Sequence, residues 1–257
     1  MNGFLKANYH AHTWRCKHAY GTEREFIEAA IELGMERFGF SDHIPCPYKN
    51  GFVSGIRMGM EQAEEYRDCI RSLQKEYAGQ IRILVGFEAE YIPEFFDEQM
   101  EMFDRLHFDY LILGQHFLGS EETGPYTGTS TGDENRIRAY VDLVIEAAKK
   151  RRFLYVAHPD IMNYNGMDSV YDWEMTRLCQ ALHELDVPLE MNILGMGTDR
   201  QYPAERFFRI AGAVGNRVVL GLDAHCVDHI YDTDSYYKCL SLAEQCHVNL
   251  VRDNILM

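Results

Sequence analysis

Seven apolar, strand-like runs alternate along this chain with seven stretches whose apolar residues recur at helical spacing. The strand-like runs are 4–12, 37–42, 81–90, 108–116, 153–159, 187–194 and 217–224. The helical stretches are 22–34, 59–78, 94–106, 133–151, 170–185, 203–214 and 235–247. This alternation predicts an α/β protein with parallel strands and helical crossovers. We expect a closed or nearly closed barrel rather than an open doubly wound sheet, because no glycine-rich nucleotide loop follows the first run.

Local signals define one helix start and two long loops. Thr22 followed by Glu25 forms a capping-box pattern, and Gly34 can end the helix that begins there. Segments 44–57 and 118–132 carry glycine, proline and threonine but no periodic pattern. Loops of this length without structure of their own are often functional.

Composition narrows the class of protein. The 257 residues, 46% hydrophobic and 25% charged, predict one domain that spans residues 1–257. A net charge of −15 argues against extended nucleic acid, although metal ions could still attract a small anionic substrate. The seven cysteines are scattered without a CxxC pair, residues 1–6 lack a signal-peptide pattern, and no apolar run approaches the roughly 18 residues of a membrane helix. We therefore expect a cytoplasmic protein that does not enter a membrane, of unknown oligomeric state.

Six of the apolar runs end in histidines or carboxylates that open a loop. Side chains two residues apart on a strand share a face, and the carboxyl ends of parallel barrel strands share one rim. Geometry alone therefore gathers the following set: His10, His12, His43, Glu88, His116, His158, Asp223 and His225. Spacing cannot choose between Glu88 and Glu90. Imidazole with carboxylate suits zinc, iron or manganese, and eight groups exceed the needs of one ion, so we expect two or three divalent ions.

The same residues resemble a known family. The opening segments are His10-Ala11-His12-Thr13, Cys16-Lys17-His18 and Phe40-Ser41-Asp42-His43. They continue in order with Gly86-Phe87-Glu88-Ala89-Glu90-Tyr91, Gly114-Gln115-His116, Ala157-His158-Pro159-Asp160, Glu190-Met191-Asn192 and Leu222-Asp223-Ala224-His225. This order resembles the PHP (polymerase and histidinol phosphatase) superfamily from about residue 6 to 230. The Arg57-Met58 segment is similar to its stand-alone histidinol-phosphatase branch.

The resemblance implies a distorted (β/α)7 barrel, similar to a TIM barrel, with a trinuclear metal site. It implies that the first metal is held by His10, His12, Glu88 and Asp223. Glu88 would also reach a second metal held by His116 and His158, and a third would be held by His18, His43 and His225. The resemblance thus selects Glu88 over Glu90 and adds His18, which lies in a loop.

The implied activity is hydrolysis of a small phosphate monoester, first of all L-histidinol phosphate in histidine biosynthesis. Glu88 would act catalytically through the metals, and Asp160 is our candidate general acid. Arg57, Arg200 and Lys49 are candidates to hold the phosphate or a substrate tail, and Glu90 or Asp160 could receive the substrate amine. His229 is a candidate for a supporting role near the metals.

Three departures from the family pattern leave the substrate open. Segment 161–165 has no basic residue, Leu222 stands where serine is common, and Arg200 is the nearest basic residue behind Gly195. The alternatives are a phosphoesterase for a nucleotide, a sugar phosphate or a short nucleic-acid end, and a silent metal-binding module. An amidohydrolase-type barrel would need a carboxylated lysine, for which the sequence offers no candidate.

Overall fold

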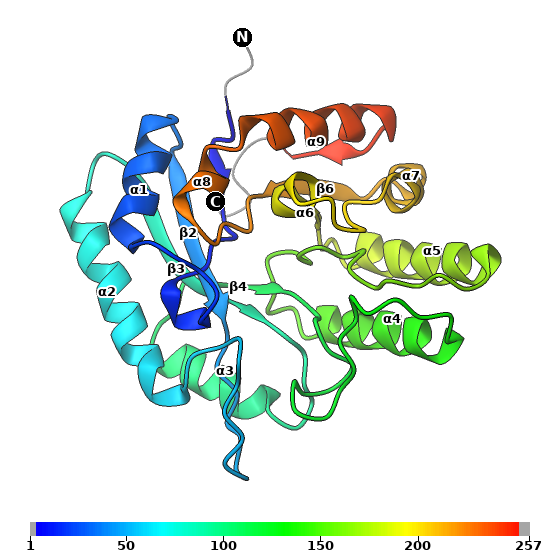
Figure 1. The fold of residues 1–257 in the computed structure, drawn as a ribbon, viewed down its shortest axis with the longest axis horizontal. Helices are drawn as coiled ribbons and strands as arrows, with labels where there is room; N and C mark the ends of the chain where they lie inside the picture. Colours follow the sequence, from blue (N-terminus) through cyan, green and yellow to red (C-terminus); the bar gives the residue numbers. More distant parts are fainter. Residues whose placement is uncertain (1–3, 252–257) are drawn as a thin grey trace.

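The computed structural model describes residues 4–251 as short parallel strands surrounded by helices (Figure 1). Residues 1–3 of the N-terminal segment and 252–257 of the predicted domain lie outside this range. The strands are β1 (Ala7–Asn8), β2 (Arg37–His43), β3 (Arg82–Ala89), β4 (Tyr110–Leu113), β5 (Leu189–Asn192), β6 (Arg217–Gly221) and β7 (Asn249–Leu250). β1 to β4 pair in chain order in one sheet and β5 to β7 in a second, with every pair parallel.

Single-residue bridges join the two sheets into a ring. Val156 lies between the two sheets: it pairs with Leu113 at the end of β4 and with Leu189 at the start of β5. On the other side, Ala11 pairs with Ala224. The prediction of a distorted α/β barrel is therefore confirmed.

The predicted strand over 153–159 is too long: Val156 alone forms bridges, and the backbone hydrogen bonds to the β4 segment run only from Leu154 to Ala157. His158 has a φ of 28°, in the left-handed region, and Pro159 has no N–H to donate to a ladder. Both features stop the strand just where its side chains reach the site. The hydrophobic pattern could not show this, because it does not report backbone dihedral angles.

All seven predicted helices are present, with boundaries shifted by a few residues. They are α1 (Glu23–Glu32), α2 (Ala63–Glu76, preceded by η2, Met60–Gln62), α3 (Phe96–Arg105), α4 (Glu134–Lys149), α5 (Asp168–Glu184), α7 (Glu205–Val214) and α9 (Thr233–Gln245). The capping box of Thr22 and Glu25 forms as predicted, with both hydrogen bonds made. The unpredicted elements are η1 (Trp14–Cys16), α6 (Ile193–Gly197), α8 (Val227–Ile230) and β7, which are too short to give a periodic signal.

Alternation along the strands separates the core from the site. In β3, Leu84 and Glu88 share a face, and Leu84 packs in a small cluster with Tyr110 and Ile112 of β4. The opposite face of these strands packs against the helices in the main core. The aromatic and aliphatic cluster therefore lies beneath Glu88 and forms a dry base for the polar side chains above it.

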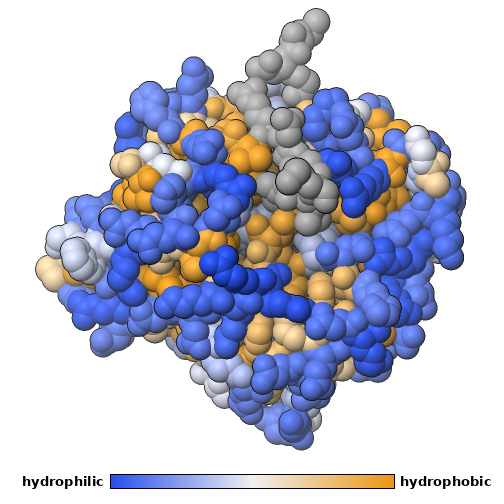
Figure 2. Space-filling model, turned by 180° about the vertical axis from the view of Figure 1, so that it is seen from behind, coloured by the Kyte–Doolittle hydropathy of each residue, from blue (hydrophilic) through white to orange (hydrophobic). Residues whose placement is uncertain are grey.

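The outer surface is mostly hydrophilic on the side shown in Figure 2, with apolar residues visible between the polar ones. This is expected where amphipathic helices bury one face against a sheet. Within residues 4–251, no helix is both long enough and apolar enough to cross a bilayer.

Candidate metal centre

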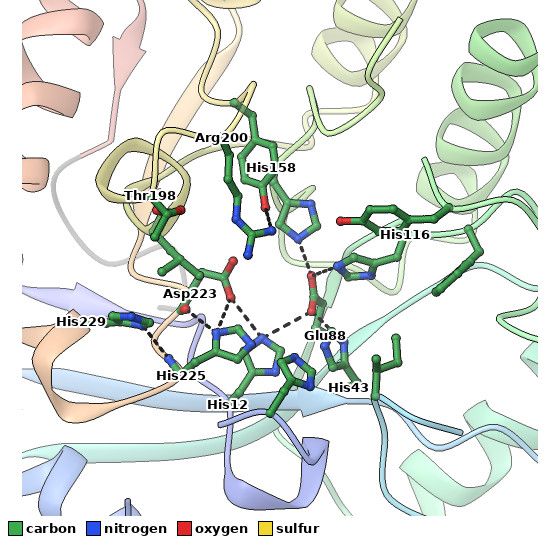
Figure 3. A pocket seen from close by; sticks show the side chains of 16 residues that line it. His12, His43, Glu88, His116, His158, Thr198, Arg200, Asp223, His225 and His229 are labelled. Carbon is green, nitrogen blue, oxygen red and sulfur yellow. Dashed lines mark hydrogen bonds and ion pairs between the residues drawn. The ribbon is translucent and has the colours of Figure 1, made fainter. Parts of the chain in front are cut away.

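Nine polar side chains converge at the carboxyl ends of the strands, several of them visible in Figure 3. His43 ends β2 and Glu88 lies next to the end of β3, whereas His18 follows η1. The remaining six lie in the loops that follow β1, β4, Val156 and β6: His10, His12, His116, His158, Asp223 and His225. The structure thus brings together every residue that was predicted as a metal ligand.

The possible ligand atoms fall into overlapping groups of three whose atoms lie within 4.8 Å of one another. The groups are His18, His43 and His225; His10, His12 and Glu88; His43, Glu88 and His116; His10, His158 and Asp223; and His12, Cys16 and His225. The first is the set expected for a third metal. The others share members, since His10, His12 and Glu88 each occur in two of them, which indicates a compact cluster rather than separate sites.

Glu88 is the centre of this arrangement. Its Oε1 lies 2.7 Å from Nε2 of His158, and its Oε2 lies 3.0 Å from Nδ1 of His43. Burial would raise the pKa of Glu88, but the surrounding imidazoles of His116, His10 and His43 lower it well below its ordinary value. Glu88 is therefore ionised at neutral pH and available to a cation.

Two glycines make room for carboxylates over the neighbouring backbone. A Cβ at Gly114 would lie 2.0 Å from Oε1 of Glu88, and one at Gly221 would lie 1.8 Å from Oε1 of Glu190. No other residue type fits these positions without displacing the carboxylates. The two glycines are thus part of the site, although their own atoms bind nothing there.

Outer partners fix the orientation of four histidines. Nδ1 of His10 lies 2.8 Å from Oε1 of Glu190, and Nδ1 of His116 lies 3.0 Å from Oε1 of Glu90. Nδ1 of His18 and Nδ1 of His225 contact the backbone carbonyls of Cys16 and Asp223 at 2.7 and 2.8 Å. A carbonyl oxygen only accepts, so His18 and His225, when neutral, carry the proton on Nδ1 and present a lone pair on Nε2, as metal-bound histidines do.

Glu190 was quoted as part of a motif, but no role was predicted for it. It is fully buried, and its Oε2 also accepts hydrogen bonds from the backbone N–H of His158 and from Nδ2 of Asn192. Its position two residues before Asn192 at the end of β5 was the available signal, because both side chains then face the site.

Unsatisfied buried atoms show that the cluster suits bound cations. Nε2 of His10, both ring nitrogens of His12, and Oδ1 of Asp223 are buried and make no hydrogen bond among the described residues. Buried polar atoms without partners are rare because leaving them unpaired is costly. Asp223 Oδ1 lies only 3.2 Å from Nε2 of His12 and 3.3 Å from Nε2 of His10, so one cation could reach all three atoms.

The cluster forms one wall of a cavity of about 490 Å³. Ile56 and Tyr126 come from the two long loops. The remaining wall, which the sequence did not predict apart from Arg200 and His229, consists of Phe117, Leu194, Thr198, Arg200, Tyr202 and His229. These residues lie in loops and short elements, where no periodicity marks them.

Of the residues predicted to hold substrate, the structure brings Arg200 to the cavity. Its guanidinium extends into the space beside Asp223 and donates to the hydroxyl of Tyr202 at 3.0 Å (Figure 3). Arg57 and Glu90 are 1% and 2% exposed, lie behind the cavity wall, and pair with each other. Lys49 is exposed and pairs with Glu98. The placement of Arg57, Glu90 and Lys49 therefore does not support direct substrate contact.

Asp160 does not line the cavity either. It is buried, and its Oδ2 accepts a hydrogen bond of 2.6 Å from the backbone N–H of Ala204, the residue before α7. Burial raises the pKa of Asp160 to about 7. Its position favours a role in capping α7 over proton donation to a substrate.

Asp160→Asn tests this placement. Between the ordinary Asp pKa of 3.8 and about 7, the folded protein keeps a proton that the unfolded chain has lost, so wild-type stability falls as the pH rises through this window. Asparagine preserves the acceptor for Ala204 and does not titrate. In the presence of a metal chelator, the unfolding temperature of Asp160→Asn minus that of wild type should rise between pH 5 and pH 8. A difference in unfolding temperature that does not change with pH would contradict the placement. We expect less than about a tenfold change in turnover, whereas loss of a general acid costs roughly 10²–10⁴-fold.

Comparison with known proteins agrees with this site. The chain matches the PHP domain family over residues 8–194. It is 34% identical over 236 residues to a Deinococcus radiodurans protein named "Probable histidinol-phosphatase", an alignment that covers 84% of this chain and 85% of that protein.

Solved structures share the fold. A chain from Listeria monocytogenes superposes with a TM-score of 0.76 at 20% identity, covering 90% of this chain and all of that one. Histidinol phosphate phosphatase from Lactococcus lactis superposes with a TM-score of 0.73 at 19% identity, covering 96% and 95%. The family match includes seven of the nine clustered side chains, and the identity to a relative extends over most of both proteins. The chain belongs to the PHP domain family.

Proposed function

We propose that this chain is a metal-dependent phosphatase that hydrolyses L-histidinol phosphate to L-histidinol and phosphate in histidine biosynthesis. The observation that carries the proposal is the similarity to the Deinococcus radiodurans protein over most of both chains. The Lactococcus lactis structure, which holds zinc, L-histidinol and phosphate, supports the choice of substrate. The cluster and its adjoining cavity supply a place for the chemistry.

Two or three divalent transition-metal ions, zinc, iron or manganese, belong to the proposal. Following the family resemblance, we assign the first to His10, His12, Glu88 and Asp223, the second to Glu88, His116 and His158, and the third to His18, His43 and His225. Of these sets, the ligand atoms of His18, His43 and His225 and those of His10, His12 and Glu88 lie within 4.8 Å of one another. Bound metals would supply an acidified water for attack on phosphorus and would neutralise the phosphoryl oxygens. The protein contributes ionised carboxylates and histidines whose Nδ1 atoms are already held.

The other cavity residues fit the parts of this substrate. Arg200 offers a guanidinium to the phosphate, and the rings of Phe117 and Tyr126, 5.7 Å apart, offer apolar faces to the imidazole. His229 accepts a hydrogen bond on Nδ1 from the backbone N–H of His225 at 3.1 Å. Neutral His229 therefore carries its proton on Nε2, where it is available to an oxygen of the ester.

Arg200→Met should lower kcat/KM by roughly 10²-fold, because the variant removes a charge-assisted contact to the phosphate. The kcat/KM of Arg200→Lys, which keeps the positive charge but not the planar guanidinium, should lie between those of Arg200→Met and wild type. The loss should be similar for histidinol phosphate and for a simple aryl phosphate, since both carry the same phosphoryl group. Arg209→Met is the control, because Arg209 is exposed on α7 and pairs with Glu205. A loss confined to histidinol phosphate would assign Arg200 to the substrate tail instead.

A panel of phosphate esters tests the proposed function. With manganese or zinc added, histidinol phosphate should be hydrolysed with a kcat/KM of about 10⁴ M⁻¹s⁻¹ or more. Turnover of only nucleotide or sugar phosphates would replace the substrate and retain the chemistry. Bound metal without turnover of any ester would favour a silent metal-binding module.

We also propose that residues 1–257 act as a single domain in the cytoplasm. One core cluster includes residues from Leu5 to Cys246, which supports a single folding unit. The seven cysteines are unpaired, which fits a reducing compartment.

A further inference from the structure

Glu121, in the second of the two long loops that border the cavity, contacts three residues of the first loop. Its Oε1 accepts a hydrogen bond from the backbone N–H of Gly55 at 2.8 Å. Its Oε2 accepts from Oγ of Ser54 at 2.5 Å and from Nε of Arg57 at 3.2 Å. The Glu121 side chain is only 11% exposed and that of Arg57 1%, so their contact is largely shielded from water, whereas Gly55 is exposed. A single residue of the second loop therefore holds the end of the first.

Arg57 continues the connection inward. Its Nη1 donates to the backbone carbonyl of Ile44 at 3.2 Å, and its Nη2 lies 3.3 Å from Oε1 of Glu90. The guanidinium is buried and has a carboxylate on each side, Glu121 outside and Glu90 inside. Burying the guanidinium removes it from water, and the two carboxylates together offset that cost. With only one of them left, part of the positive charge would be buried without a partner, so the loss of either carboxylate weakens the whole arrangement.

Glu90 connects this pair to the metal centre. Its Oε1 lies 3.0 Å from Nδ1 of His116, whose Nε2 faces Glu88 at 3.6 Å. The chain Glu121–Arg57–Glu90–His116 therefore runs without a break from a surface loop to a side chain of the cluster. We call these four residues the buried relay.

We propose that Glu121 and Arg57 are positioning residues that hold both cavity loops in place and, through Glu90, orient the imidazole of His116. This role rests on the proposed function only in that His116 is taken as a metal ligand. Partners behind metal-bound histidines typically change metal affinity or activity by about 10- to 100-fold when removed. The relay also explains why Arg57 and Glu90 are buried side by side instead of facing the substrate.

Glu121→Gln tests the relay with a close control. Glutamine keeps the size of the side chain but loses the charge that faces Arg57. Glu122→Gln is the matched control, because Glu122 also reaches the first loop, by accepting from Nδ2 of Asn50 at 2.6 Å, but is exposed and makes no contact with Arg57. Both variants change one carboxylate in the same loop by the same chemistry.

Two readouts do not depend on turnover. In the metal-free protein, amide hydrogen exchange at Gly55 and Arg57 should be at least about tenfold faster in Glu121→Gln than in wild type, and unchanged in Glu122→Gln. After loading with zinc, release of metal to a chelator should be about tenfold faster in Glu121→Gln alone. Arg57→Met should release metal at a similar rate, and adding Glu121→Gln to it should have little further effect, since the two act in one chain.

Equal effects of the Glu121 and Glu122 variants would reduce the finding to general loop loosening and overturn the proposal. Faster exchange with unchanged metal release would confine Glu121 to the loops and overturn its link to His116. Because neither readout uses a substrate, an error in the proposed substrate leaves both results interpretable.

Discussion

Glu88→Gln is expected to lower kcat/KM by roughly 10³-fold or more while the fold remains. Glu88 belongs to two of the groups of possible ligands, and its pKa is held well below its ordinary value. Glutamine has the same shape but no charge, so the cluster would lose the carboxylate that its cations share. Because the side chain lies on a strand supported by a dry hydrophobic base, the substitution should not unfold the barrel.

The measurements are steady-state kinetics with saturating manganese or zinc, the metal content after dialysis, and circular dichroism. Metal content should fall together with turnover. Glu101→Gln, on the exposed side of α3, is the control and should match wild type in all three. Turnover within tenfold of wild type would rule out Glu88 as a shared ligand and dismantle the cluster as assigned.

The second large effect is expected for His225→Ala, with a loss of about 10²-fold or more in kcat and a smaller change in KM. His225 belongs to the group with His18 and His43 and stacks on His12 at a ring distance of 4.1 Å. Removing the His225 imidazole should weaken metal binding by His18 and His43, while the side chains proposed for the other two metals stay in place. The variant therefore separates the contribution of the third proposed metal from that of the first two.

Metal analysis should find fewer ions per chain in His225→Ala than in wild type, without complete loss. His183→Ala, on the exposed end of α5, is the matched histidine control. If His225→Ala retains its full metal content and full rate, the third group does not bind a catalytic ion.

The positions of the long strands along the sequence were predictable, because a buried strand requires an apolar run of about its own length. The predicted 37–42 and 81–90 closely match β2 and β3. The run at 153–159 failed for a conformational reason, the left-handed backbone at His158. Asp160 follows this turn, and the structure places it under Ala204 instead of in the cavity.

The ligand set was predictable to the extent that it follows strand ends. That rule named seven side chains of the cluster and left Glu88 open against Glu90. The family resemblance was needed to select Glu88 and to add His18, which follows a 3-10 helix in a loop. Arg57 and Glu90 were predicted to hold the substrate, and the structure places them outside the cavity lining, paired with each other. Glu121, the other carboxylate that pairs with Arg57, lies 64 residues after it, and a pairing over that separation leaves no local pattern in the sequence.

The single-residue closure of the barrel gives the metals a mechanical role. His10 and His12 flank Ala11, whereas Asp223 and His225 flank Ala224, so the cluster straddles the seam where the segments that follow β1 and β6 meet. Only two backbone hydrogen bonds, of 2.8 and 3.3 Å, join these flanking segments at the Ala11–Ala224 pair. A cation held by side chains from both segments would connect them across the seam, as a cross-link does. Its binding free energy would then add to the stability of the folded protein. Chelation should therefore loosen this edge of the barrel first, before the better paired strands β2 and β3 respond.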